Sequence, residues 1–130
     1  MILTITGIYA AILGVLFIIL RTVVIIERAK SGISIMYQDN MVLAEKIRRF
    51  GNFTEVVPLA LILLAISEIS GVPNYLLHGI GGALLISRIL HPFGLDAENG
   101  KNPLRILSGV LTSLAFVMAI GSFGFYQFAT

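Results

Sequence analysis

Four long apolar stretches separated by three short polar segments make up almost the whole chain. The apolar stretches cover about residues 2–26, 41–69, 75–91 and 103–128. A helix of roughly 20 residues, with a usual range of about 17 to 25, crosses the hydrocarbon core of a bilayer. Each stretch is long enough to do so. We therefore predict an all-α membrane protein in which residues 1–130 form one domain, a bundle of four transmembrane helices.

The polar segments carry signals for where helices begin and end. Gly32 is a helix-stop signal after the first stretch. Asp39 or Asn40 can cap the second helix, because short polar side chains accept hydrogen bonds from free N–H groups at a helix start. Asn102 stands before Pro103, and proline is favoured at the first helical position. The sequence thus predicts where the second and fourth helices start.

Composition strengthens the membrane assignment and excludes several functions. Hydrophobic residues make up 57% of the chain and charged residues 12%, whereas soluble domains carry about 25% charge. Cysteine is absent and there are two histidines, so we expect no metal centre. The net charge of +2 and the lack of basic runs interleaved with aromatic residues predict no nucleic-acid partner.

The basic residues are distributed unevenly along the chain. Of the nine lysines and arginines, Arg21 interrupts the first apolar stretch, and the other eight lie in or beside the first and third polar segments. Positively charged loops stay on the cytoplasmic side. We therefore expect both of these segments in the cytoplasm and both termini on the non-cytoplasmic side. The eight residues are Arg28, Lys30, Lys46, Arg48, Arg49, Arg88, Lys101 and Arg105.

One face of the second helix carries a candidate binding motif. Arg48, Asn52 and Glu55 follow one another at intervals of four and three residues, which places them on a single helix face where the helix enters the membrane. Carboxylates are costly there and usually mark a site or a partner. The alternative is a structural pair, in which an arginine from another helix neutralises Glu55.

Four further basic or titratable positions gather at the same membrane face. Arg88 and His91 lie near the end of the third helix, Arg105 lies in the first turn of the fourth, and Arg28 ends the first. Free N–H groups at a helix start also favour anions. Together these residues indicate a receptor for a polyanion. In the simpler alternative, the arginines set the topology and bind lipid phosphates.

We expect two other groups of residues to have structural roles. Gly79, Gly81 and Gly82 lie mid-membrane without a preceding strand, so we interpret them as a close helix contact rather than a phosphate-binding loop. Glu68 and His78 lie near the outer ends of the second and third helices, where we expect them to form an interfacial pair.

The chain resembles the MAPEG family, the membrane-associated proteins in eicosanoid and glutathione metabolism, and especially its short bacterial members. The likeness covers essentially the whole chain. Its most specific part is the segment RRFGNFTEVVPLALILL, residues 48–64. The pattern R-x-x-H at 88–91 and P-x-R at 103–105 adds weight through order and spacing.

The resemblance implies a homotrimer that holds glutathione as cosubstrate between adjacent subunits, in the cytoplasmic half of the membrane. Arg105 matches an arginine that some members use for the glutathione sulfur, and it is the candidate catalytic residue. The other positions match residues that bind glutathione or line its site. They are Arg28, Arg48, Asn52, Glu55, Arg88 and His91.

Two positions depart from the pattern of the eukaryotic eicosanoid enzymes. Leu95 stands where those enzymes have a tyrosine that helps to hold the ligand. Ile106 follows Arg105, where a prostaglandin synthase has a serine that is proposed to activate the thiol. Activation of the thiol is therefore the part of the resemblance that transfers least directly.

The sequence thus favours a membrane-bound glutathione-dependent transferase or peroxidase that acts on lipophilic small molecules, reached through the membrane lipid, in a bacterial inner membrane. A second hypothesis is a non-catalytic protein of the same fold that binds an anionic or lipid ligand. A small four-helix exporter is disfavoured, because proton coupling needs a carboxylate deep in a helix and the first helix has none before Glu27.

Overall fold

The computed structural model describes residues 2–96 and 98–129, and this part of the chain folds into four α-helices. All four are long and apolar enough to cross a membrane. The predicted all-α fold with four transmembrane helices is confirmed. The helices are α1 (Thr4–Ser31), α2 (Met41–Ile69), α3 (Asn74–Gly94) and α4 (Pro103–Phe128).

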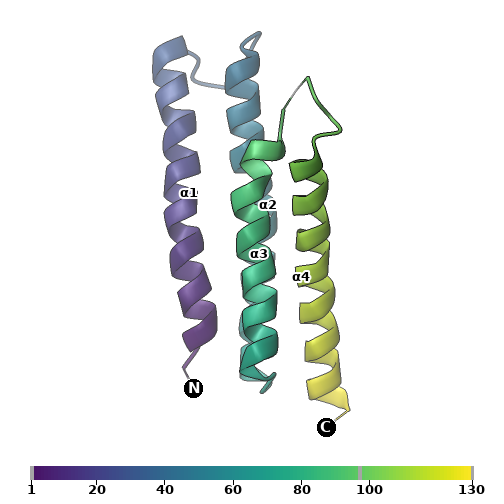
Figure 1. Ribbon diagram of the computed structural model, residues 1–130. Helices are drawn as coiled ribbons and strands as arrows, with labels where there is room; N and C mark the ends of the chain where they lie inside the picture. The colour runs from purple at the N-terminus through teal and green to yellow at the C-terminus, as the bar shows by residue number, and fades with distance from the viewer. Residues whose placement is uncertain (1, 97, 130) are drawn as a thin grey trace.

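The helices run alternately up and down beside one another, and both chain ends lie at the same end of the bundle (Figure 1). Helices α2 and α3 occupy the middle, α1 packs against both on one flank, and α4 packs against both on the other. Among the described residues, α1 and α4 do not touch. The first and third polar segments therefore meet at the end opposite the termini, and which side of the membrane this end faces remains a prediction.

Helix α1 extends five residues beyond its predicted end. We expected it to stop near residue 26, where charged residues begin, yet it continues to Ser31. It ends where Gly32 adopts a left-handed φ of 70° and donates its N–H to the carbonyl of Arg28 over 2.9 Å. Charged residues do not end a helix, whereas a glycine in the left-handed conformation does. Gly32 therefore predicted the end of α1 correctly, and the start of the charged residues did not.

Helix α3 likewise continues past its predicted end at residue 91, with Pro92 inside its last turn. The helix closes when the N–H of Leu95 donates to the carbonyl of His91 over 3.1 Å. At the starts of α2 and α4 the predicted caps are present. The side chain of Asn40 accepts from Leu43 N–H and that of Asn102 from Leu104 N–H, both over 3.0 Å.

The end of α2 is tied to the start of α1 by Glu68. Its two carboxylate oxygens accept the backbone N–H groups of Ile5 and Thr6 over 2.9 and 2.8 Å. The predicted pair with His78 is therefore wrong. Helix α1 has no cap of its own, so a carboxylate from the neighbouring helix takes that place, and His78 lies instead against the hydroxyl of Tyr9, 3.2 Å from its Nδ1.

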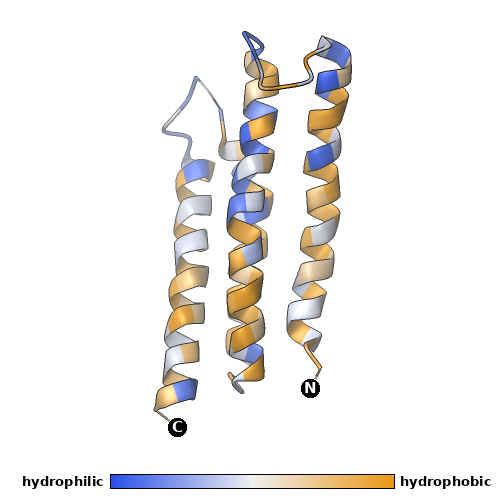
Figure 2. Ribbon diagram, turned by 180° about the vertical axis from the view of Figure 1, so that it is seen from behind, coloured by the Kyte–Doolittle hydropathy of each residue, from blue (hydrophilic) through white to orange (hydrophobic). Residues whose placement is uncertain are grey.

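Apolar side chains pack between the helices in two clusters, one nearer each end of the bundle. Of the three mid-membrane glycines, Gly81 allows a close helix contact of the kind that the sequence predicted, because a side chain there would overlap the ring of Tyr9. Most other large apolar side chains point outward, as expected for a surface facing lipid. Figure 2 shows hydrophilic residues gathered mainly toward the end that carries the longer polar segments. The fully buried members of the two clusters are Leu13, Leu64, Leu77, Ile80 and Leu84.

Candidate functional site

A cavity of about 270 Å³ opens between α2, α3 and α4 in the half of the bundle that carries the polar segments 32–40 and 95–102. Three arginines and a histidine line it, and none of its lining residues is acidic. Such a wall attracts negative charge. Five of the seven residues singled out from the sequence line this cavity: Arg48, Asn52, Arg88, His91 and Arg105.

Arg88 is the buried centre of the site. It is 3% exposed, and each of its guanidinium nitrogens donates a hydrogen bond. Nη1 donates to Asn52 Oδ1 over 2.7 Å, Nε to Ser87 Oγ over 3.1 Å, and Nη2 to the hydroxyl of Thr112. All three acceptors are uncharged. The positive charge of Arg88 is therefore held in place without being neutralised, which leaves it free to act on an anion in the cavity.

The rim of the cavity carries a bidentate ion pair within α2. Arg48 Nη1 and Nη2 donate to the two carboxylate oxygens of Glu55 over 2.9 and 3.1 Å. Both side chains are more than half exposed. The alternative from the sequence placed the partner of Glu55 on another helix, and that alternative is wrong. Because the pair is exposed, it contributes little to stability, and both groups remain accessible to a ligand.

Arg105 is placed by the close approach of α3 and α4. Gly94 ends α3 directly against the backbone of Leu104 and Arg105, where any side chain would overlap it. Asn102 and Pro103 begin α4 as a capped helix. In the described residues the guanidinium of Arg105 has no hydrogen-bond or ion-pair partner. It is thus an unpaired cation on a fixed backbone at the cavity wall.

Arg28 does not join this cavity within one subunit. Its Nη1 donates to the carbonyls of Ile33 and Met36 over 3.2 and 3.0 Å, so it holds the segment between α1 and α2. The resemblance places the ligand between subunits, where Arg28 would come from a neighbour. A role for Arg28 in binding therefore remains a prediction.

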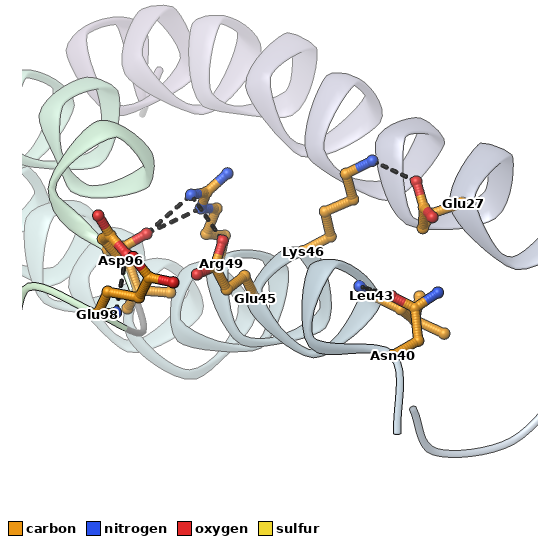
Figure 3. A network of polar contacts seen from close by, with 9 residues as sticks. Glu27, Asn40, Leu43, Glu45, Lys46, Arg49, Asp96 and Glu98 are labelled. Atoms are coloured by element: carbon orange, nitrogen blue, oxygen red, sulfur yellow. Dashed lines mark hydrogen bonds and ion pairs between the residues drawn. The ribbon is translucent and has the colours of Figure 1, made fainter. Parts of the chain in front are cut away.

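Three residues of the site were not foreseen from the sequence. Thr112 and Ser87 accept hydrogen bonds from Arg88. Thr112 could have been found from the sequence, because it lies seven residues after Arg105 and so shares its helix face. Arg49 has a separate role: its Nε and Nη2 donate to the carbonyl of Leu95 over 3.3 and 2.8 Å, and Nη2 also meets Glu45 (Figure 3). Arg49 thereby fastens the end of α3 onto α2 beside the cavity.

A second ion pair stabilises the same end of the bundle. Lys46 on α2 donates to Glu27 on α1 over 2.5 Å (Figure 3). Lys46 and Arg49 are therefore both paired with carboxylates, and neither lines the cavity. Arg48 is thus the basic residue of this helix left facing the site.

This arrangement can be compared with known proteins. A family model described as the MAPEG family matches residues 6–125. The chain belongs to the MAPEG family. That match spans all four helices, and so the likeness to MAPEG proteins noted in the sequence is confirmed.

Two curated relatives match more locally. The inner membrane protein YecN from Escherichia coli strain K12 is 35% identical over 52 residues, and YecN from E. coli O6:H1 strain CFT073 matches equally. The aligned segment spans 40% of this chain and 40% of each relative. With four spanning helices, this supports the predicted multi-pass inner-membrane location. No solved structure matches the chain.

Proposed function

We propose that this MAPEG protein is a membrane-bound glutathione-dependent transferase or peroxidase acting on lipophilic electrophiles. The observation that carries the proposal is the cavity wall of Arg48, Arg88 and Arg105, with Asn52 and His91, and without a carboxylate. Glutathione carries two carboxylates, one ammonium group and a thiol. It therefore needs several cations and one anion, and the cavity together with Glu55 at its rim supplies that combination.

The proposed roles follow from the charges and their exposure. Arg48 and Glu55 are accessible and opposite in sign, so they suit the carboxylate and ammonium ends of the tripeptide. Arg88 is buried in the cavity wall and donates to Asn52, which is half-buried. In a homotrimer, Arg28 of a neighbouring subunit would complete the site from the other side.

Arg105 is the proposed catalytic residue. The bound tripeptide supplies a thiolate nucleophile, and a cation beside a thiol favours its deprotonated form. Arg105 is suited to this because its guanidinium is unpaired and its backbone is fixed against Gly94. The lipophilic substrate would enter from the membrane.

The test is conjugation of glutathione to 1-chloro-2,4-dinitrobenzene by the purified protein in detergent. We expect turnover in the wild type and a loss of about 10²-fold in Arg105→Gln, as for removal of other groups that stabilise developing negative charge. Arg105→Gln should still gain thermal stability from glutathione, since the other contacts remain. Unchanged turnover in Arg105→Gln would remove the role given to this residue.

One observation favours a second candidate, a protein of the same fold that binds an anion without turnover. Of the cavity's lining residues, Thr112 alone carries a hydroxyl, and it already accepts from Arg88 and donates to the carbonyl of Ser108. With Leu95 and Ile106 beside Arg105, no hydroxyl is available to hold a thiolate. Stabilisation by glutathione without any conjugation or peroxidase activity would favour this candidate.

A further inference from the structure

A second cavity adjoins the candidate site at the polar end of the bundle, where segments 32–40 and 95–102 lie. It measures about 300 Å³, and its walls come from α2, from the end of α3 with the segment that follows, and from the start of α4. Both cavities are lined by Arg48, Leu95 and Arg105. These three residues form a shared wall, so the two cavities are neighbours.

One face of α2 lines both cavities and gives their order. Its residues there follow one another at intervals of four, three and four, and they are Met41, Glu45, Arg48 and Asn52. At 1.5 Å per residue, Glu45 lies about 10 Å nearer the polar end than Asn52, and Arg48 lies between them. The second cavity is thus the outer cavity, and the candidate site is the inner cavity.

The two cavities differ in charge. Among the described residues no acid lines the inner cavity, whereas Glu45 and Asp96 line the outer cavity. In this part of the chain Asp96 makes no ion pair, and its Oδ1 accepts the backbone N–H of Glu98 over 2.9 Å. Arg105 is likewise unpaired. A carboxylate and a guanidinium therefore border the outer cavity without binding each other, which leaves both to a ligand with charges of both signs.

Arg49 holds the acidic wall of the outer cavity in place. It donates to Glu45 Oε2 over 3.4 Å and to the carbonyl of Leu95, the residue before Asp96, over 2.8 Å (Figure 3). The contact with Glu45 is longer than the roughly 2.7–2.9 Å of a strong charged hydrogen bond, so it neutralises this carboxylate only in part. Arg49 itself lines neither cavity.

This inference rests on the function proposed for the inner cavity. There, Arg48 binds one end of glutathione and Arg105 binds the thiolate, so the sulfur lies where the two cavities meet. The group that becomes joined to the sulfur is then directed into the outer cavity. With both arginines engaged by the tripeptide, the remaining walls are the two carboxylates and the apolar side chains of Met41, Ala44 and Leu95.

We propose that the outer cavity binds the second substrate and that Glu45 and Asp96 select electrophiles with an ammonium end. The substrate class is a cationic amphiphile, with an apolar body that carries the leaving group and an amine at the far end. The body contacts Met41, Ala44 and Leu95, and the ammonium group lies between the two carboxylates. Amphiphiles of this kind lie at the membrane surface with the charged end in water, which agrees with a substrate that comes from the membrane.

With an aryl chloride as electrophile, the reaction is a substitution. The thiolate sulfur forms a bond to the ring carbon that carries chlorine, the carbon–chlorine bond breaks, and chloride leaves with the bonding electron pair. The thiol proton goes to water. Glu45 and Asp96 contact the amine and not the reacting atoms, so they should change KM more than kcat.

The experiment uses three derivatives of 4-chloro-3-nitrobenzamide, whose tails on the amide nitrogen end in an ammonium group, a neutral acetamide or a carboxylate. Their glutathione conjugates are prepared chemically, and isothermal titration calorimetry measures the affinity of each for the full chain in detergent. One exposed charge contact changes an affinity by roughly threefold. With two carboxylates, we expect the wild type to bind the ammonium conjugate about tenfold more tightly than the carboxylate conjugate. The KM values of the three chlorides should follow the same order.

The variants remove the charges and keep the hydrogen-bond acceptors. Asp96→Asn and Glu45→Gln should each reduce the preference to about threefold, and the double variant should lose it. The neutral conjugate should bind all variants alike, which shows that they are folded. Glu98→Gln is the matched control, because Glu98 lines neither cavity and bonds to Asp96 through its backbone. It should keep the preference of the wild type.

Equal affinities for the ammonium and carboxylate conjugates in the wild type would overturn the proposal. A preference that Asp96→Asn and Glu45→Gln leave unchanged would do the same, and so would an equal loss in Glu98→Gln, which would assign the effect to surface charge. Failure of the proposed function looks different. Conjugates that bind in the expected order without turnover of any chloride would contradict the transferase and support the outer site, whereas turnover of all three chlorides with equal KM would do the reverse.

Discussion

Arg88 on α3 donates a hydrogen bond of 2.7 Å to the side-chain carbonyl of Asn52 on α2. The same guanidinium reaches Thr112 on α4, so one buried cation joins three helices. These acceptors are uncharged, so they hold the guanidinium in place without neutralising its positive charge. That charge lines the cavity. The stability of the bundle and the anion binding proposed for the cavity would therefore depend on the same residues.

Asn52→Leu should expose that dependence. It removes the acceptor for Nη1 and leaves a buried charged donor unpaired, which costs about 1–3 kcal/mol or more for a charged group. We expect a lower melting temperature and weaker stabilisation by glutathione. Thr112→Val removes the acceptor for Nη2 on α4 and should act in the same direction. Wild-type melting of both variants would contradict the role given to the network.

Glu55→Gln should separate ligand binding from stability. The pair with Arg48 is more than half exposed, and exposed ion pairs contribute about 0–1 kcal/mol. We expect the melting temperature without ligand to stay close to that of the wild type, while the shift produced by glutathione becomes smaller. Glu27→Gln is the matched control, since it breaks an ion pair outside the cavity. An equal glutathione shift in wild type and Glu55→Gln would argue against a contact between this carboxylate and the ligand.

Arg49→Gln should loosen the wall of the cavity, although Arg49 itself does not line it. It removes both hydrogen bonds to the carbonyl of Leu95, which follows directly on α3. We expect faster hydrogen exchange in residues 93–96. Exchange in the segment around Gly32, which Arg28 holds instead, serves as the internal reference and should not change. Equal protection of residues 93–96 in both proteins would show that the end of α3 does not need Arg49.

Much of this architecture follows from local sequence. The lengths of the apolar stretches predict four spanning helices, and the side chains of Asn40 and Asn102 begin α2 and α4 as expected. The predicted end of α1 was too early because polarity marks the edge of the membrane and not the end of a helix. The predicted end of α3 was also too early, but for another reason: Pro92 restricts the residue before it, yet it fits inside the final turn of this helix.

The site was predicted by position and missed in its pairings. Spacing along α2 places Arg48, Asn52 and Glu55 on one face, but spacing cannot show that Arg48 and Glu55 bond to each other. Which acceptors surround Arg88 depends on the packing of α3 against α4. The partners of Glu68 are backbone N–H groups. Every residue except proline has such a group, so the pattern of side chains cannot predict this contact.

Glu68→Ala should weaken the start of α1. The carboxylate takes the place of an N-cap, and loss of a cap costs about 0.5–2 kcal/mol. We expect faster hydrogen exchange at the amides of Ile5 and Thr6 and a modest drop in melting temperature. Ser70→Ala, two residues further along, is the control, because its hydroxyl donates to Gln127 and not to α1. Unaltered exchange at the two amides would contradict the capping role.

Gly81→Ala and Gly82→Ala form a pair that tests the close contact in the middle of the membrane. An added Cβ at Gly81 overlaps the ring of Tyr9, whereas at Gly82 it meets the hydroxyl of Tyr9 at 3.8 Å, an ordinary contact. Overpacking costs about 1–3 kcal/mol, while alanine is favoured over glycine inside a helix by roughly 1 kcal/mol. Thermal unfolding in detergent should therefore show a clear loss for Gly81→Ala and none for Gly82→Ala. Because Tyr9 also donates its hydroxyl to the carbonyl of His78, the ring cannot turn aside without losing that bond. Equal melting temperatures for the two variants would mean that α1 can move away from α3, and the contact would then not fix the place of α1 in the bundle.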